Sequence, residues 1–166
     1  PYAPARQSSR HKIWSSSSAA NCYATMEDLL QVCLLSEDAH MPCYGSTGAA
    51  GLDLFAARSI TIPSDKFVWV ETDVSMAIPE GYVGIVKSRS SMAGKGVYSE
   101  AGVIDADYRG HVKIHLRNET PEAVTISAGA KIAQMLLVPV LRPTIVGTSV
   151  LDATDRGEGG FGSTGA

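Results

Sequence analysis

The fold class of this chain is decided by one stretch, HVKIHLR at residues 111–117. Its apolar residues Val112, Ile114 and Leu116 alternate with polar or charged ones, which is the pattern of a strand with one buried face. Other short apolar runs recur between turn residues, at 67–70, 83–86, 124–126, 132–140 and 144–146. Strands at this spacing, without a sustained helical period, predict an all-β antiparallel sandwich or barrel.

Two further segments complete the predicted elements. Gln31–Leu35 fits a first strand, although Met26–Leu35 also fits a helical turn. Ser90–Lys95 predicts one short helix. We therefore expect a nearly all-β domain with a single short helix.

The composition fits one compact domain with a tail. The chain has 166 residues, of which 45% are hydrophobic and 19% charged, so it can bury a core. Its 16 glycines make up about 10% of the chain, whereas average usage is about 7%. This surplus indicates many tight turns or exposed backbone. The formal net charge of -3 gives no reason to expect direct nucleic-acid binding. No run reaches the roughly 20 apolar residues of a membrane span, so we expect no membrane partner.

Three cysteines, Cys22, Cys33 and Cys43, are odd in number and lack C-x-x-C spacing. Neither a disulfide scaffold nor a zinc site is therefore expected. We interpret Cys33 and Cys43 as buried thiols, and we expect a reducing intracellular compartment, the cytoplasm or the nucleus.

The first 30 residues differ from the rest of the chain. They are rich in serine and arginine, and no acidic residue precedes Glu27. Such leaders are typical of organelle transit peptides, so mitochondrial targeting is one interpretation and an unstructured arm is the other. We divide the chain into a disordered arm at 1–30, a barrel at 31–152 and a flexible glycine-rich arm at 153–166.

Five segments carry residues that are poor choices for structure alone: AAGLDL at 49–54, KSRSSMAGKG at 87–96, AGVIDADYRG at 101–110, GAKIAQ at 129–134 and RGEGGFGSTGA at 156–166. The second combines cations, hydroxyls and glycines, which suits a phosphate site, although it lacks the Walker spacing and also fits a solvated turn. In the first segment, Asp53 is equally consistent with a turn aspartate. The fourth segment also fits an ordinary entry from a loop into a strand.

The third segment holds two acids, Asp105 and Asp107, next to Tyr108. In a hairpin the two carboxylates would share a face, and one of them beside a phosphate could act as a general base. Turn acids with a packed tyrosine are the structural alternative. Spacing alone does not choose between the two acids.

The fifth segment is too rich in glycine to form a core. Its arginine, aromatic ring and hydroxyls would suit an arm that closes over a nucleotide, stacking on the base and binding phosphates. A tail without function is the alternative.

In order, spacing and content, the five segments resemble the motifs of the trimeric deoxyuridine triphosphate nucleotidohydrolases (dUTPases), from about Leu30 to Ala166. The resemblance implies a jelly-roll-like β-barrel that forms a homotrimer with shared active sites. It also implies Mg2+-assisted hydrolysis of dUTP to dUMP and pyrophosphate. This reaction keeps uracil out of DNA and supplies dUMP for thymidylate synthesis.

The resemblance also implies roles for individual residues. Asp105 would be the general base for attack of water on the α-phosphorus, and Asp53 would hold magnesium through water. Tyr108 would pack on the deoxyribose. Backbone at Ala101, Gly102 and Gly110 would bind uracil. Phosphate contacts and closure would come from Arg89, Ser90, Ser91, Gln134, Arg156, Phe161, Gly162, Ser163 and Thr164.

Two residues depart from the family pattern. Ser91 stands where the family usually has glycine, and Lys131 replaces a common arginine. Lysine keeps the charge but loses the planar fork, so an arginine-specific pairing is not expected there.

Two other functions stay open at the level of sequence. A dCTP deaminase-like enzyme would share the barrel and the trimer, although the third and fifth motifs argue against it. A noncatalytic trimer that senses nucleotides or binds a partner would keep the barrel, although the intact acid, tyrosine and phenylalanine favour catalysis.

Several chemically suggestive residues are interpreted as structural. His111 and His115 would lie about 13 Å apart on a strand, too far to share a metal ion, so we expect solvent-facing histidines. Trp14 and Trp69 are interpreted as packing residues rather than stacking platforms.

Overall fold

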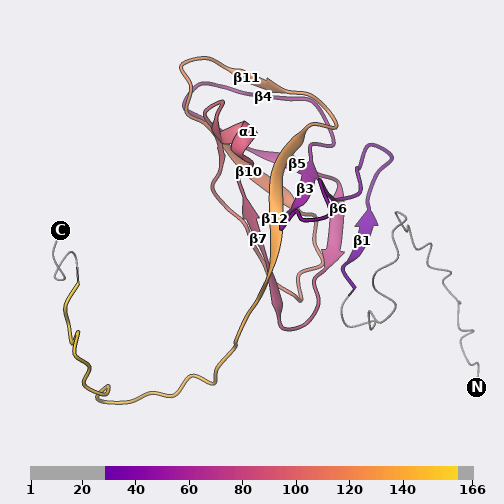
Figure 1. The fold of residues 1–166 in the computed structure, drawn as a ribbon. Helices are drawn as coiled ribbons and strands as arrows, with labels where there is room; N and C mark the ends of the chain where they lie inside the picture. The colour runs from indigo at the N-terminus through magenta and orange to yellow at the C-terminus, as the bar shows by residue number, and fades with distance from the viewer. Residues whose placement is uncertain (1–28, 161–166) are drawn as a thin grey trace, which may run out of the picture.

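The computed structural model describes residues 29–160 (Figure 1). Within this range the chain forms short strands and one helix. The strands are β1 (Gln31–Leu34), β2 (Cys43–Tyr44), β3 (Leu52–Phe55), β4 (Ile60–Ile62), β5 (Phe67–Glu71), β6 (Val74–Ala77), β7 (Tyr82–Lys87), β8 (Val97–Ser99), β9 (Val103–Ile104), β10 (Lys113–Asn118), β11 (Val124–Ile126) and β12 (Lys131–Pro139). The helix, α1, covers Ser90–Ala93. The prediction of an all-β fold with one short helix is confirmed.

The largest sheet has the strand order β2-β3-β12-β7-β9, and its neighbours are antiparallel. Strand β12 lies at its centre (Figure 1). Its residue Gln134 is opposite Asp53 of β3 on one side and Lys87 of β7 on the other. This register brings three of the five motifs to one place in the sheet.

A second sheet, β5-β10-β8, and two strand pairs, β1-β6 and β11-β4, surround the same core in a jelly-roll-like arrangement. Strands β8 and β10 are antiparallel, and the chain between them, residues 100–112, forms the loop of a hairpin. Strand β9 lies within this loop but pairs with β7 of the large sheet. The third motif therefore joins the two sheets.

The alternation that defined the fold class is present in β10. Ile114, Leu116 and Asn118 are buried, and the residues between them face outward. The strand begins at Lys113 rather than His111. Just before it, the Val112 N–H donates to the carbonyl of Val74, the first residue of β6. The core around this strand consists of aliphatic side chains, the largest fully buried ones being Leu54, Ile62, Ile114, Leu116, Ile132 and Met135.

Two sequence interpretations are wrong. Residues 144–146 are not a strand: they lie in the segment that leaves the sheet after β12, and Ile145 is 95% exposed (Figure 1). A strand needs a neighbour for its backbone hydrogen bonds, and none lies beside this segment in residues 29–160. Cys33 and Cys43 are exposed rather than buried, because β1 and β2 each have one strand neighbour and lie at sheet edges.

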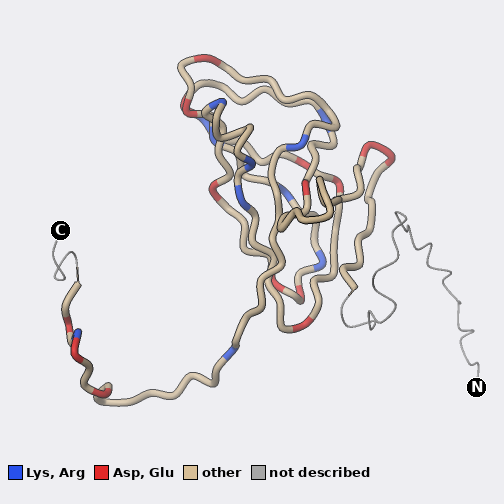
Figure 2. Tube along the Cα trace, viewed as in Figure 1, with Lys and Arg blue, Asp and Glu red and all other residues tan. Residues whose placement is uncertain are grey.

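Charged residues of both signs are interspersed along the described chain rather than separated by sign (Figure 2). The first-strand interpretation of Gln31–Leu35 is right, since β1 covers Gln31–Leu34. The helix in residues 29–160 has only 4 residues and is far too short to cross a membrane.

Candidate functional site

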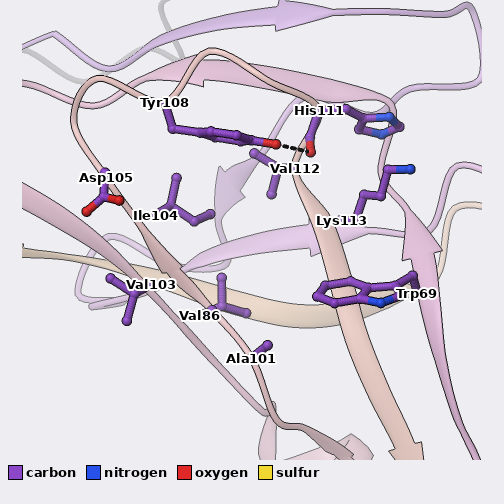
Figure 3. Close-up of a pocket in the computed structure, with 11 residues that line it drawn as sticks. Trp69, Val86, Ala101, Val103, Ile104, Asp105, Tyr108, His111, Val112 and Lys113 are labelled. Carbon is purple, nitrogen blue, oxygen red and sulfur yellow. Dashed lines mark hydrogen bonds between the residues drawn. The ribbon is translucent and has the colours of Figure 1, made fainter.

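A cavity of about 530 Å3 opens between the two sheets at the third motif (Figure 3). One wall is the chain from Ala101 to Tyr108, and the opposite wall comes from β5 and the start of β10. The lining residues are Trp69, Val86, Ala101, Gly102, Val103, Ile104, Asp105, Tyr108, His111, Val112 and Lys113. Its volume suits a small organic ligand.

A tight turn shapes the outer end of the cavity. The Tyr108 N–H donates to the Asp105 carbonyl at 3.1 Å, which closes the turn. The Tyr108 hydroxyl donates to the His111 carbonyl at 3.1 Å (Figure 3). A Cβ at Gly110 would lie only 2.5 Å from Cζ of Tyr108, so this ring position requires glycine there.

The turn separates the two acids of the motif. Asp105 precedes the turn and lines the cavity (Figure 3). Asp107 lies within the turn and is exposed, and it is not among the residues that line the cavity. The geometry therefore favours Asp105 as the acid that faces a ligand.

Gly102 lies at the inner end of the cavity, against β7. Its carbonyl accepts a hydrogen bond from the Val86 N–H at 2.8 Å. A Cβ at this position would lie 3.2 Å from Cα and 3.0 Å from Cγ2 of Val86, and closer still to its Cβ. Only glycine lets the two backbones approach this closely.

A second group of candidate residues gathers where β3, β12 and the end of β7 meet. Arg89 Nε lies 2.9 Å from Oδ1 of Asp53, and Lys131 Nζ lies 2.6 Å from Oδ2. Arg89 also donates to Ser91 Oγ at 3.2 Å, and the Gln134 amide donates to the Ser88 carbonyl at 3.1 Å. We call Asp53, Arg89, Ser91, Lys131 and Gln134 the β3–β12 cluster.

The β3–β12 cluster has one carboxylate between two cations. Asp53 is buried, and both of its oxygens face a cation. The cluster therefore carries a net positive charge, which suits a polyanionic ligand. Asp53 could contact a magnesium ion through water, which is compatible with an ion held mainly by phosphate oxygens.

The other candidates lie elsewhere or outside the described range. Ser90 begins α1 and is exposed. Arg156 donates from Nε to the Gly159 carbonyl at 2.8 Å, in the exposed segment beyond the barrel. Phe161, Gly162, Ser163 and Thr164 lie outside residues 29–160, as does Trp14.

Asp105, the acid in the cavity wall, and the β3–β12 cluster lie at opposite ends of β7. Ile104 is opposite Gly84, so Asp105 continues toward Val83, whereas Arg89 follows the other end of the strand. Six residues separate Val83 from Arg89 in the sequence, which corresponds to about 20 Å of extended chain. One copy of the chain therefore does not bring Asp105 and Arg89 together on one phosphate group.

Besides aliphatic residues, sequence reasoning missed three residues of the cavity wall: Trp69, His111 and Lys113. Trp69 is 54% exposed and its ring lies 4.6 Å from that of His115, so it is not a core residue. His111 is half-buried against Glu71 and Asp73 rather than solvent-facing. These contacts depend on the pairing of β5 with β10, and no local signal in the sequence reports that pairing.

Glu71, Asp73 and His111 have ligating atoms within 4.8 Å of one another, as a metal site would. Cations of the protein already neutralise the acids, however: Lys113 Nζ lies 2.9 Å from Glu71, and Arg58 lies 2.8 Å from Asp73. His111 Nε2 is also engaged, because it accepts the Asp73 N–H at 2.8 Å. The group is therefore an ion-pair network.

Comparison with known proteins decides the family. The family model described as dUTPase matches residues 37–165. The chain belongs to the dUTPase family. This dUTPase is 46% identical over 132 residues to the "Probable deoxyuridine 5'-triphosphate nucleotidohydrolase" of Schizosaccharomyces pombe, covering 79% of this chain and 94% of that protein. It is 46% identical over 143 residues to the deoxyuridine 5'-triphosphate nucleotidohydrolase of Oryza sativa, covering 86% and 84% of the two chains.

Solved structures agree with this family. A mutant dUTPase of Staphylococcus bacteriophage 80alpha, solved with dUpNHpp, superposes on this dUTPase with a TM-score of 0.80 at 31% identity. The match covers 84% of this chain and 99% of that one. A phage phi11 dUTPase mutant, whose structure concerns a structural Mg(II) ion, superposes with a TM-score of 0.72 at 30% identity, covering 75% and 99% of the two chains. The chain therefore has the fold of the dUTPase family, whose members are nucleotide hydrolases.

Proposed function

We propose that this dUTPase hydrolyses dUTP to dUMP and pyrophosphate, with Asp105 as the general base for water attacking the α-phosphorus. The observation that carries the proposal is that Asp105 and Tyr108 line the same cavity (Figure 3). A carboxylate within reach of a bound water can take its proton as the oxygen attacks phosphorus. The negative charge then moves to the phosphate oxygens and the leaving pyrophosphate.

The cavity would hold the nucleoside. Tyr108 would pack on the deoxyribose and leave no room for a 2′-hydroxyl. Backbone groups of Ala101, Gly102 and Gly110 would bind the uracil edge. The presence of Ala101 and Gly102 in the cavity wall supports this assignment, whereas Gly110 lies against the Tyr108 ring and is not among the lining residues.

The β3–β12 cluster would bind the triphosphate. Arg89, Ser90, Ser91 and Gln134 would contact phosphate oxygens, and the positive charge would stabilise the reacting group. The C-terminal arm would close the site. In it, Phe161 would stack on uracil, while Arg156, Gly162, Ser163 and Thr164 would contact the phosphates and exclude water.

A magnesium ion would be held mainly by the triphosphate, with Asp53 in contact through water. When bound, the ion would neutralise phosphate charge and polarise the phosphoryl oxygens. The pairing of Asp53 with two cations supports an indirect role, because neither carboxylate oxygen is free of a cation. Chelation should abolish dUTP turnover, and added Mg2+ should restore it.

A homotrimer with shared sites would bring the cavity with Asp105 and the β3–β12 cluster together in one active site. The separation of Asp105 from Arg89 along β7 supports this arrangement, since one copy of the chain does not place both on one phosphate group. Cyclic assembly would place the cavity of one copy against the β3–β12 cluster of the next. The barrel at 31–152 and the closing arm at 153–166 would then belong to different sites.

The compartment of the protein is a further part of the proposal. We expect the reducing cytoplasm or nucleus, with residues 1–30 as an arm or a mitochondrial leader. The relative "Deoxyuridine 5'-triphosphate nucleotidohydrolase, mitochondrial" of Homo sapiens, which is 44% identical over 137 residues, supports testing the second role. A fusion of residues 1–30 to a reporter would distinguish the two.

The assay for the function measures pyrophosphate release from dUTP, UTP, dCTP and dTTP. We expect dUTP to be strongly preferred, because the cavity backbone would exclude the methyl group of thymine and mismatch cytosine. Ammonia release from dCTP would instead indicate a deaminase. Tight dUTP binding in Mg2+ without turnover would indicate a noncatalytic sensor.

A further inference from the structure

The His111 imidazole contacts Glu71 and Asp73 through its two nitrogens. We call residues 71–73, which end β5 and lead into β6, the β5–β6 connection. Nε2 accepts a hydrogen bond from the Asp73 N–H at 2.8 Å, and Nδ1 lies 3.0 Å from Oε2 of Glu71. A nitrogen that accepts an N–H bond carries no proton, so Nε2 acts as the acceptor in this contact. The approach of Nδ1 to Glu71 is not a hydrogen bond, since Glu71 Oε2 has no hydrogen-bond partner within residues 29–160. The Asp73 hydrogen bond thus fixes the orientation of the ring.

The β5–β6 connection is itself held in place. Asp73 is buried, with Arg58 2.8 Å from Oδ2 and the Ser36 hydroxyl donating to the same oxygen at 2.6 Å. Lys113 Nζ lies 2.9 Å from Oε1 of Glu71. Asp73 also has φ of +53°, in the left-handed region, which aspartate enters more readily than most residues with a Cβ. These contacts restrict the movement of the connection and of the residues that are hydrogen-bonded to it.

The main chain after His111 is bonded to the same support. The Val112 N–H donates to the Val74 carbonyl at 2.9 Å, and the Thr72 hydroxyl donates to the Val112 carbonyl. On its other side, the His111 carbonyl accepts the Tyr108 hydroxyl at 3.1 Å (Figure 3). A continuous series of contacts thus runs from Asp73 through His111 to Tyr108 and the turn that follows Asp105.

We propose that His111 is a positioning residue for the dUTPase reaction, whose ring anchors the Asp105–Tyr108 turn on the β5–β6 connection. The proposal rests on the function proposed above, because it takes the cavity to hold the nucleoside of dUTP. Anchoring keeps the Tyr108 ring over Gly110 and Asp105 in the cavity wall. A ring that keeps its place excludes a 2′-hydroxyl more strictly than one that moves.

Two conservative substitutions separate this role from simple packing. The carbonyl oxygen of glutamine can occupy the place of imidazole Nε2 and accept the Asp73 N–H. The shorter asparagine reaches only the place of Nδ1 and leaves that N–H without its acceptor. His111→Gln should therefore restore what His111→Asn loses. Both keep a polar side chain, so both test the proposal even if His111→Ala does not fold.

The first measurement is amide hydrogen exchange of residues 105–112 in the ligand-free protein. His111→Asn should exchange about tenfold faster there, and His111→Gln should stay within about twofold of the wild type. His40→Ala is the matched control, because it removes an imidazole that stacks on Phe55 at 5.5 Å and has no contact with the turn. It should leave exchange at 105–112 unchanged.

The second measurement is steady-state kinetics with dUTP and UTP. His111→Asn should raise KM for dUTP about tenfold with a smaller change in kcat, and it should lower the preference for dUTP over UTP. His111→Gln should recover both. Unchanged exchange and unchanged preference in His111→Asn, or equal effects of Asn and Gln, would overturn the proposal. A wild-type protein without dUTP turnover would overturn the proposed function, and exchange would still test the anchor.

Discussion

Lys131 Nζ lies 2.6 Å from Oδ2 of Asp53, in the centre of the largest sheet. The bulge in β12 between Lys131 and Ala133 lies at the start of this strand, next to β3. Lys131 thus supplies one of the two cations that neutralise this buried carboxylate. A single ammonium suffices because Arg89 contacts the other carboxylate oxygen at 2.9 Å.

Replacing Lys131 should therefore affect the triphosphate more than the nucleoside. Lys131→Met should raise the Kd of dUpNHpp about tenfold, because one cation of the β3–β12 cluster is lost, while Lys131→Arg should stay near the wild type. Calorimetry with dUpNHpp and dUMP measures both. An equal loss of affinity for dUMP would contradict the assignment of this cluster to the triphosphate.

Asp105→Asn should lower kcat for dUTP by about a thousandfold or more, because the amide cannot accept the proton of the attacking water. Binding of dUpNHpp should persist, since the cavity keeps its shape. Asp107→Asn is the matched control: the residue lies two positions away and outside the cavity lining, so its kcat should be unchanged. The reverse result would assign the base to Asp107.

Mixing two inactive variants should restore activity if sites are shared between subunits. Asp105→Asn and Arg89→Ala each damage every site of their own homotrimer. In mixed trimers, one kind of interface combines an intact Asp105 with an intact Arg89. Turnover by variants that are denatured and refolded together, compared with those refolded apart, measures this. A sum of the separate activities would place both residues in one copy of the chain.

Gly102→Ala should destabilise the fold and close the inner end of the cavity. The added Cβ would meet the Val86 side chain and lie 3.2 Å from its Cα, so backbone as well as side chain must shift. A loss of about 1–3 kcal/mol in the free energy of unfolding is expected from overpacking of this kind. Gly147→Ala is the control, because a Cβ there meets nothing within 4 Å. Equal stability of the two variants would contradict the close approach.

Much of the fold followed from local pattern. The alternation at Val112, Ile114 and Leu116 reports burial on one face directly, and the core contains all three residues. The run at 144–146 consists of β-branched residues, which favour strands, but it forms none, because strand formation depends on a neighbouring edge as well as on propensity. Edge position likewise exposes Cys33 and Cys43, which composition alone suggested were buried.

The site was predictable to the extent that its motifs are contiguous. Asp105, Tyr108, Ala101 and Gly102 are near neighbours in the chain, and all four line the cavity. Trp69 and Lys113 reach the same cavity from elsewhere in the sequence because β5 pairs with β10. Asp53, Arg89 and Lys131 meet through the pairing of β3, β12 and β7, and their spacing in the sequence gives no hint of distances under 3 Å.

The amino-acid pattern was enough to predict the all-β fold class, the short helix and the family resemblance, because each is written in short contiguous segments. Three relationships between residues could be found only in the folded chain. They are the place of Asp105 but not Asp107 in the cavity wall, the two cations around Asp53, and the hydrogen bond between His111 and Asp73. Each depends on which strands lie side by side, and long-range pairing is set by the packing of the whole core rather than by any local segment.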